Sequence, residues 1–168
     1  MKDPFTRVAA ALNSAAVRYL LIGVWGANYY AKGKVFVTQD QDLFVPQDAA
    51  NLLLAWNTLE SLGLDLRADD QPLDRPRDAF LARAVTDRAA LTTATDGHHL
   101  HVDLTMVMGA FRFDDAWSRR REFRSHGVAV PVAALGDIIA AKAAADRPKD
   151  RLFLATHAEE LRKLLGGR

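Results

Sequence analysis

The sequence predicts an α/β (α+β) domain in which helices flank a mixed central β-sheet. Three observations lead to this class. Short apolar runs of strand length alternate with amphipathic helix patterns over the first 60 or so residues, a series of strand-like segments follows, and two helix-like segments come last. The chain has 168 residues, of which 49% are apolar and 26% charged. No repeat or linker divides it, so we expect residues 1–168 to form a single domain with one core.

The first half shows helix and strand patterns with clear boundaries. Asp3 and Pro4 suit the start of a helix whose apolar residues form one stripe. Gly23 ends a short apolar strand, Pro46 follows a longer one, and Gly63 ends the next helix. The expected elements are helix 4–16, strand 19–22, helix 25–30, strand 35–45 and helix 49–62.

The second half begins with a polar stretch, 65–87, rich in Asp, Arg and Pro, which we expect to be a loop around one short helix at 79–84. Asp96-Gly97 and His126-Gly127 are turn signals between strands, and Pro148 suits the first turn of a helix. The expected elements are strands 90–94 and 99–107, a loop or short helix at 111–117, two strands around 126–127 with the second at 128–132, and helices 135–145 and 148–165.

Composition excludes several classes of protein. The net charge of +1 implies no broad attraction to nucleic acid or membrane, and the absence of cysteine excludes disulfides and thiolate metal sites. No uninterrupted apolar run approaches the roughly 20 residues of a membrane span, and the N-terminus lacks the pattern of a signal peptide. We therefore expect a cytoplasmic protein with no membrane partner.

The stretch LIGVWG, residues 21–26, is a strand, a glycine turn and a helix start. Free backbone N–H groups at such a helix start form a cradle for phosphate. The alternative is an ordinary turn in which Gly23 serves only backbone geometry.

The stretch VFVTQDQDLFV, residues 35–45, carries Asp40 and Asp42, which point to the same side of a strand. Carboxylates are preferred ligands of Mg²⁺, and an ion would remove the repulsion between them. The alternative is a solvated pair. An EF-hand calcium site is excluded because the further ligands of its loop are missing here. A haloacid dehalogenase-type phosphatase site does not fit, because Phe44 occupies the position where those enzymes have a small hydroxyl residue.

The stretch HHLHVDLTMV, residues 98–107, places His99, His101 and Asp103 on one side of a strand. Asp103 stands between Val102 and Leu104, and a charge in such a buried strand needs a cation beside it. The histidines are either transition-metal ligands or solvated side chains of a hairpin.

Taken in order, these features resemble the nucleotidyltransferase superfamily of DNA polymerase β type, in particular its small bacterial members. The resemblance covers residues 17 to 165 or so and implies a nucleotidyltransferase-like fold with a C-terminal helix pair. The matching segments are Leu21-Ile22-Gly23, Thr38-x-Asp40-x-Asp42-Leu43, Val102-Asp103-Leu104, Leu135-Gly136-Asp137-Ile138-Ile139 with Lys142, and Arg147-Pro148-Lys149-Asp150.

The resemblance implies transfer of a nucleoside monophosphate from an NTP to a hydroxyl on RNA or tRNA, a protein or a small molecule, and some small relatives belong to toxin–antitoxin pairs. Asp40, Asp42 and Asp103 are the implied catalytic residues and ligands of Mg²⁺ or Mn²⁺, with Asp103 also helping to deprotonate the acceptor. The side chains of Lys142, Arg147 and Lys149, which the resemblance assigns to NTP binding, are alternatively helix-end charges. The implied NTP-binding residues are Gly23, Val24, Thr38, Lys142, Arg147 and Lys149.

Two positions depart from the family pattern. Val24 replaces the second glycine or serine of the phosphate turn, and Phe36 replaces an arginine common in small relatives. These departures favour an alternative in which the chain is a non-catalytic module that binds a nucleotide or a partner. A metal-dependent glycosyltransferase is a more distant alternative. The basic run 118–124 either contacts RNA or is a solvated surface.

Overall fold

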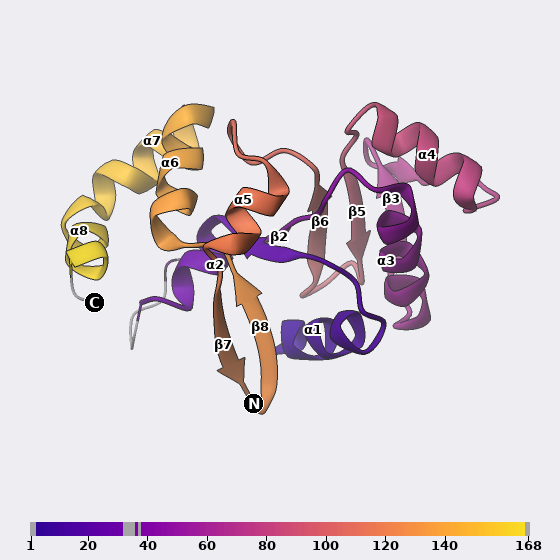
Figure 1. Ribbon diagram of the computed structural model, residues 1–168, viewed down its shortest axis with the longest axis horizontal. Helices are drawn as coiled ribbons and strands as arrows, with labels where there is room; N and C mark the ends of the chain where they lie inside the picture. Colours follow the sequence, from indigo (N-terminus) through magenta and orange to yellow (C-terminus); the bar gives the residue numbers. More distant parts are fainter. Residues whose placement is uncertain (1–2, 32–35, 37, 167–168) are drawn as a thin grey trace.

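The protein is described from a computed structural model, which covers residues 3–31, 36 and 38–166. This part of the chain forms an eight-stranded mixed sheet with eight helices, so the predicted fold class is confirmed (Figure 1). The helices are α1 Pro4–Ser14, α2 Gly23–Asn28, α3 Ala49–Ser61, α4 Ala79–Asp87, α5 Phe113–Ser118, α6 Leu135–Ala145, α7 Pro148–Thr156 and α8 Ala158–Gly166. The strands are β1 Leu20–Ile22, β2 Gln41–Phe44, β3 Asp65–Ala68, β4 Gln71–Pro72, β5 Thr92–Thr95, β6 His101–Thr105, β7 Arg121–Ser125 and β8 Val128–Val132.

The strands follow the spatial order β4-β3-β5-β6-β2-β1-β8-β7. The pairs β2–β6 and β1–β8 are parallel, and the other pairs are antiparallel. β2 and β6 therefore lie side by side in the middle of the sheet, although about 60 residues of chain separate them.

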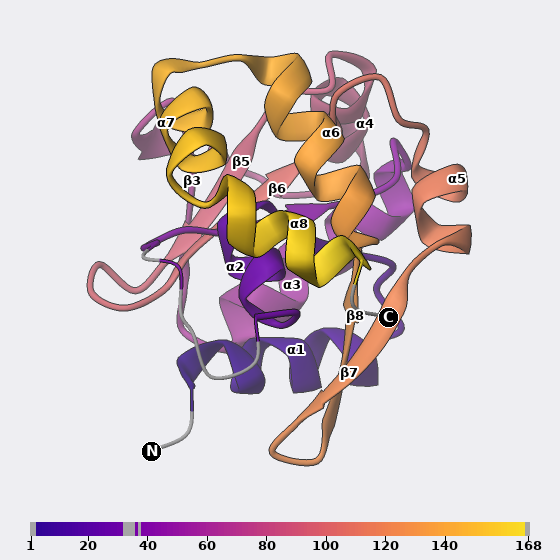
Figure 2. The same ribbon diagram turned by 90° about the vertical axis from the view of Figure 1, so that its left-hand side faces the viewer.

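Five of the helices lie at two ends of the molecule (Figure 1). α3 and α4 contact each other at one end of the molecule, while α6, α7 and α8 form the other end (Figures 1 and 2). α1 packs against β8 and α3, and α2 packs against β1, β2 and α6. Trp56 of α3 is fully buried and donates a hydrogen bond from Nε1 to Thr92 Oγ1 at 3.1 Å. Burial of such side chains is the main contribution to the stability of this core.

The expected loop at 65–72 was wrong, whereas the expected short helix at 79–84 is present as part of α4. Residues 65–72 form the hairpin β3–β4, and α4 runs on to Asp87. β3 pairs with β5 and buries Leu66, while Asp65 is exposed. β4 is the edge strand, with Gln71 and Pro72 both exposed, and β3 lies beside it; the polar residues of this hairpin hide its strands in the sequence.

The predicted strand 35–45 is shorter in the structure, where it spans Gln41–Phe44; residues 35 and 37 lie outside the described residues. The predicted last helix is divided at His157, so three helices, α6 to α8, close the described chain. His157 has a φ of −110° instead of a helical value, and its ring contacts Phe36 and Phe153. Within the described part of the chain, no helix is both long and apolar enough to cross a membrane.

Candidate functional site

Asp42 of β2 and Asp103 of β6 form an acid pair at the centre of the sheet. They are direct partners in the parallel register, so their side chains leave the same face of the sheet. Asp103 also accepts a hydrogen bond from Thr93 Oγ1 at 2.6 Å, and its Oδ1 lies 3.4 Å from His101 Nε2. Thr93 of β5 lies opposite Asp103 in the antiparallel pairing of β5 and β6. The sequence does not predict this register, so Thr93 was not among the predicted site residues.

The environment of Asp42 favours its protonated form. Burial raises the pKa of Asp42 to about 6, and the charges of Asp103 and Asp40 and a hydrogen bond with Asp103 add to the rise. The positive charge of Lys142 opposes it. Two carboxyl groups in this arrangement attract a cation because its charge removes their repulsion.

Gly23 lies directly against the acid pair. Its φ is +68°, and a Cβ at this position would lie 2.7 Å from Asp42 Oδ2. Ile22, the residue before it, pairs with Asp42 across β1 and β2. Glycine is therefore required by the backbone and by the neighbouring carboxylate. Val24, the next residue, is partly buried and packs against the apolar core.

A cleft of about 330 Å³ opens beside the acid pair. It brings together four residues that the sequence singled out, namely Gly23, Asp42, Lys142 and Arg147. Thr105 and Met108 also line it and were not predicted. We call this hollow the cationic cleft, because Lys142 and Arg147 face Asp42 across it.

Lys142 and Arg147 are joined through Asp150, whose side chain is fully buried. Lys142 Nζ lies 3.3 Å from Asp150 Oδ1, and Arg147 Nε lies 2.6 Å from Oδ2. Burial raises the pKa of Asp150, but the Arg147 hydrogen bond and the charges of Lys142 and Arg147 outweigh it and hold the pKa below its usual value. The two cations therefore stabilise the junction of α6 and α7, and both also line the cleft.

No family model matches the sequence, and no curated protein shows significant similarity to it. The solved structures that match include two of ANT(2″)-Ia, an aminoglycoside nucleotidyltransferase. The crystal structure of ANT(2″)-Ia with adenylyl-2″-tobramycin has a TM-score of 0.53 and 17% identity, over 97% of this chain and 93% of that one. The solution structure of this antibiotic-resistance factor has a TM-score of 0.54 and 16% identity, over 97% and 88%. The chain has a nucleotidyltransferase-type fold.

Within this nucleotidyltransferase fold, the other predicted site residues lie outside the cationic cleft. Asp40 precedes β2, is exposed, and lines a neighbouring polar hollow with His98, His99 and His101. Lys149 is exposed in the first turn of α7. In the described ranges, no three His, Asp or Glu side chains lie close enough together to form a ready cation site. Asp42 and Asp103 are thus in direct contact, while Asp40 acts on Asp42 only through its charge.

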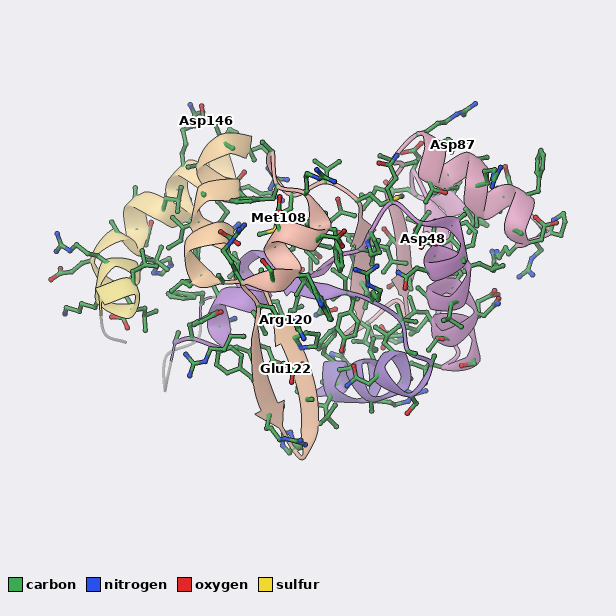
Figure 3. All side chains as sticks on the ribbon, in the orientation of Figure 1. Asp48, Asp87, Met108, Arg120, Glu122 and Asp146 are labelled. Atoms are coloured by element: carbon green, nitrogen blue, oxygen red, sulfur yellow. The ribbon has the colours of Figure 1, made fainter. Side chains whose placement is uncertain are left out.

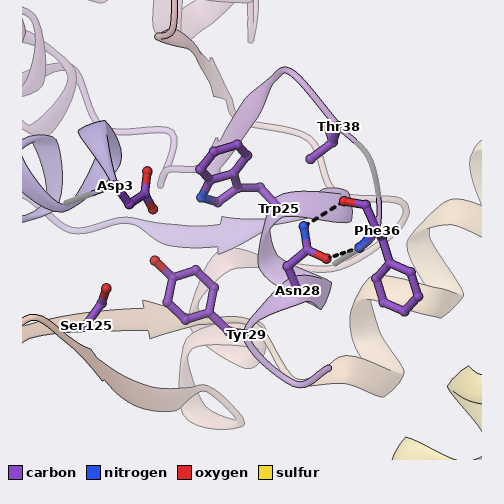
Figure 4. Close-up of a pocket in the computed structure, with 7 residues that line it drawn as sticks. All are labelled: Asp3, Trp25, Asn28, Tyr29, Phe36, Thr38 and Ser125. Atoms are coloured by element: carbon purple, nitrogen blue, oxygen red, sulfur yellow. Dashed lines mark hydrogen bonds between the residues drawn. The ribbon is translucent and has the colours of Figure 1, made fainter. Parts of the chain in front are cut away.

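Thr38 lines a different hollow of about 520 Å³, between α2 and β7 (Figure 4). Trp25 and Tyr29 form apolar walls there, and Asn28 hydrogen-bonds the backbone of Phe36 through both its oxygen and its nitrogen. Thr38 Oγ1 donates to Asp40 O at 3.5 Å, which supports the turn that leads into β2.

Phe36 belongs to an aromatic cluster with the C-terminal helices. Its ring centroid lies 5.3 Å from that of Phe153 and 4.6 Å from that of His157. Phe36 therefore makes an apolar contact that links the segment before β2 to α7 and to His157, the residue that follows α7.

The arginines of the run 118–124 bind groups of the protein itself. Arg119 Nε lies 2.8 Å from Asp137 Oδ2, and the Arg120 guanidinium stacks 3.8 Å from the ring centre of Trp117. Arg120 Nε also lies 3.7 Å from Glu122 (Figure 3 labels both residues). These contacts favour a structural role over RNA binding.

The residues at the acid pair fit a divalent cation of the Mg²⁺ type. Such an ion prefers oxygen ligands and takes one or two carboxylates together with substrate phosphates. Asp42 and Asp103 supply those oxygens at a place where burial has raised the pKa of a carboxyl group, and the cleft beside them has room for phosphates.

The raised pKa of Asp42 predicts an unusual pH dependence of stability in the absence of metal. The unfolded Asp42 loses its proton near pH 4 and the folded one near pH 6, so rising pH between these values favours the unfolded state. Asp42→Asn cannot lose a proton and should be more stable than the parent at pH 7, by about 1–2 kcal/mol after allowance for coupling. Urea unfolding in EDTA at pH 4.5 and pH 7 measures this. The same pH dependence in parent and variant would contradict it.

Proposed function

We propose that this protein is a metal-dependent nucleotidyltransferase that moves a nucleoside monophosphate from an NTP to a hydroxyl acceptor, with Mg²⁺ or Mn²⁺. One observation carries the proposal. Asp42 and Asp103 stand in register on adjacent parallel strands, and Asp42 lies against the Gly23 turn and lines a cleft together with Lys142 and Arg147. The fold, which ANT(2″)-Ia shares, supports the same reading.

Each residue has a defined task in this proposal. Asp42 and Asp103 would hold the ion, and Asp40 is proposed to complete its oxygen ligands. When bound, the ion neutralises charge that develops on the phosphate oxygens. Asp103 accepts the proton of the acceptor hydroxyl, with Thr93 holding its carboxylate in place. The phosphates lie toward Lys142 and Arg147.

The other predicted contacts with the NTP phosphates are not all supported by the same observations. The backbone N–H groups of the turn at Gly23 and Val24 are proposed to bind phosphate, since Gly23 lines the cleft. Thr38 and Lys149 do not line it, so their proposed phosphate contacts rest on the resemblance alone. The resemblance to small bacterial members of the DNA polymerase β-type superfamily extends the proposal to an RNA, tRNA or protein acceptor in a toxin–antitoxin pair. ANT(2″)-Ia with adenylyl-2″-tobramycin adds a small-molecule acceptor.

The direct test incubates the protein with each labelled NTP, Mg²⁺ or Mn²⁺, and candidate acceptors that include total RNA, cell proteins and aminoglycosides. Label is expected to move to one acceptor class with release of pyrophosphate. Asp42→Asn should abolish it, whereas Asp114→Asn, the same change at an exposed carboxylate of α5, should not. Pyrophosphate release that survives Asp42→Asn would contradict the proposal.

A second candidate is a non-catalytic module that binds a nucleotide or a partner. Phe36 favours it, because an aromatic cluster occupies the position of a family cation. The pairing of Lys142 and Arg147 with Asp150 favours it too, because those charges are already partly neutralised. Calorimetric titration with Mg²⁺–ATP that shows binding, together with no transfer to any acceptor, would establish this candidate.

Divalent metal is expected to raise the melting temperature, because a ligand that binds only the folded state stabilises it by mass action. Removal of the repulsion within the acid pair adds to the effect. At ten times the dissociation constant the gain is about 1.4 kcal/mol, which for a chain of this size is roughly 3–5 °C. Thermal scans with Mg²⁺ or Mn²⁺ against EDTA measure it. Asp40→Asn/Asp42→Asn should lose the shift, and an equal shift in the variant would place the ions elsewhere.

A further inference from the structure

The hollow of about 520 Å³ between α2 and β7 is lined by four separate parts of the chain. We call it the Asp3 hollow; its lining residues are Asp3, Trp25, Asn28, Tyr29, Phe36, Thr38 and Ser125 (Figure 4). None of these residues lines the cationic cleft. The proposed nucleotidyl transfer takes place at the cleft and therefore does not explain this second hollow.

The Asp3 hollow has a negative electrostatic potential. Among the described residues that line it, Asp3 alone carries a charge at neutral pH. This charge is felt at the wall of the hollow, because burial and then the charge of Asp3 raise the pKa of Tyr29 to about 12. The same potential disfavours an anionic ligand such as a phosphate and favours a cation.

Two aromatic side chains add surfaces that attract a cation. Trp25 lies in α2, and Tyr29 follows the last residue of that helix, so the two are four residues apart on one side of it. Both are partly buried, and the Tyr29 hydroxyl points toward Asp3 and Ser125 (Figure 4). The negative face of an aromatic ring attracts an ammonium group, and the face of tryptophan does so most strongly.

The polar groups of the Asp3 hollow are mainly hydrogen-bond acceptors. Asp3 Oδ1 accepts from Phe5 N at 3.0 Å, and a carboxylate has lone pairs for further donors. The Tyr29 hydroxyl oxygen is buried, and among the described residues it has no hydrogen-bond partner, so its lone pairs add to the negative potential. The Asn28 amide donates to Phe36 O and accepts from Phe36 N, so its donor is already used.

We propose that the Asp3 hollow binds an organic ammonium group, carried by a small amine or by a lysine side chain. The nitrogen lies against the Asp3 carboxylate and within about 6 Å of the faces of Trp25 and Tyr29. The hydrocarbon part of the ligand occupies the rest of the hollow. A neutral aromatic ring would gain nothing from the carboxylate. Because the hollow and the cleft share no lining residue, this ligand is distinct from the acceptor of the proposed reaction.

The test compares each cation with an uncharged compound of similar shape. Choline is paired with its carbon analogue dimethylbutanol, and butylammonium with pentanol. Each is titrated into ¹⁵N-labelled protein, where the Trp25 indole N–H and the amides of Tyr29 and Ser125 should shift. At least one cation should bind fivefold or more tightly than its neutral partner. Equal affinities would overturn the proposal, and so would shifts confined to Gly23 and Ala141, which would place the cation in the cleft.

A substitution at Asp3 then tests the carboxylate without loss of the fold. Asp3→Asn keeps the cap of α1, because asparagine caps a helix about as well as aspartate does. It should weaken binding of the preferred cation at least fivefold and leave that of the neutral partner unchanged. Asp78→Asn is the matched control, since Asp78 caps α4 in the same way and does not line the hollow. Unchanged cation binding by Asp3→Asn would overturn the proposal.

A third probe identifies the source of the ammonium group. Nα-acetyl-lysine methylamide presents a lysine side chain as it occurs in a protein. If it binds more tightly than choline and butylammonium, the site takes a lysine of another protein. If it binds more weakly than either, the site takes a small amine.

Discussion

Asp103→Asn is expected to lower nucleotidyl transfer by about a thousandfold or more, because it removes the group that accepts the proton of the acceptor hydroxyl and a ligand of the ion. The fold should survive. Asparagine can still accept the hydrogen bond from Thr93, and the loss of charge removes a cause of the raised pKa of Asp42. The variant should therefore melt no lower than the parent in EDTA.

Single-turnover transfer and calorimetric titration of Mg²⁺–ATP, measured on the same preparations, test this expectation. Transfer should fall by orders of magnitude while ATP affinity changes only a few fold, because Lys142, Arg147 and Asp42 remain in the cleft. Asp114→Asn is the matched control, the same chemical change at an exposed carboxylate. Transfer by Asp103→Asn at the parental rate would remove Asp103 from the chemistry.

Asp150→Asn is expected to reduce the free energy of unfolding by about 2–3 kcal/mol, because it leaves cations without their buried counter-charge. Lys142 is the more affected partner, since its side chain is only 12% exposed, against 57% for Arg147. The carboxylate also accepts from the backbone N–H of Arg147, in a capping box at the start of α7. The loss should weaken the junction of α6 and α7.

Urea unfolding of parent, Asp150→Asn and Asp146→Asn measures the effect. Asp146 forms an exposed ion pair with Arg151 at the same junction, so its loss should cost less than about 0.5 kcal/mol. Asparagine also tolerates the φ of +49° found there. Because the folded pKa of Asp150 is lowered, its contribution is present at neutral pH and is lost as pH falls through that pKa. A cost for Asp150→Asn no larger than that for Asp146→Asn would show that the buried cluster adds no stability.

The outline of the fold was predictable because its signals are local. Asp3, Pro4, Gly23 and Gly63 mark the ends of helices or strands within a few residues of sequence, and apolar periodicity identifies the segments between them. The spacing of Asp40 and Asp42, and the apolar neighbours of Asp103, likewise singled out carboxylates that the structure brings near one another.

The tertiary structure decided what depends on partners distant in the sequence. Strand β3, which contains Asp65 and Arg67, forms between β4 and β5, and the break at His157 accompanies ring contacts with Phe36 and Phe153. The sequence by itself determined which residues are candidates for the chemistry, since side-chain type and local spacing can be read from it. Only the fold decided that Asp42 meets Asp103 in register and that Asp150 holds Lys142 and Arg147. The partner of a strand or of a buried charge is whichever strand or charged group the folded chain places beside it, and local sequence does not specify that partner.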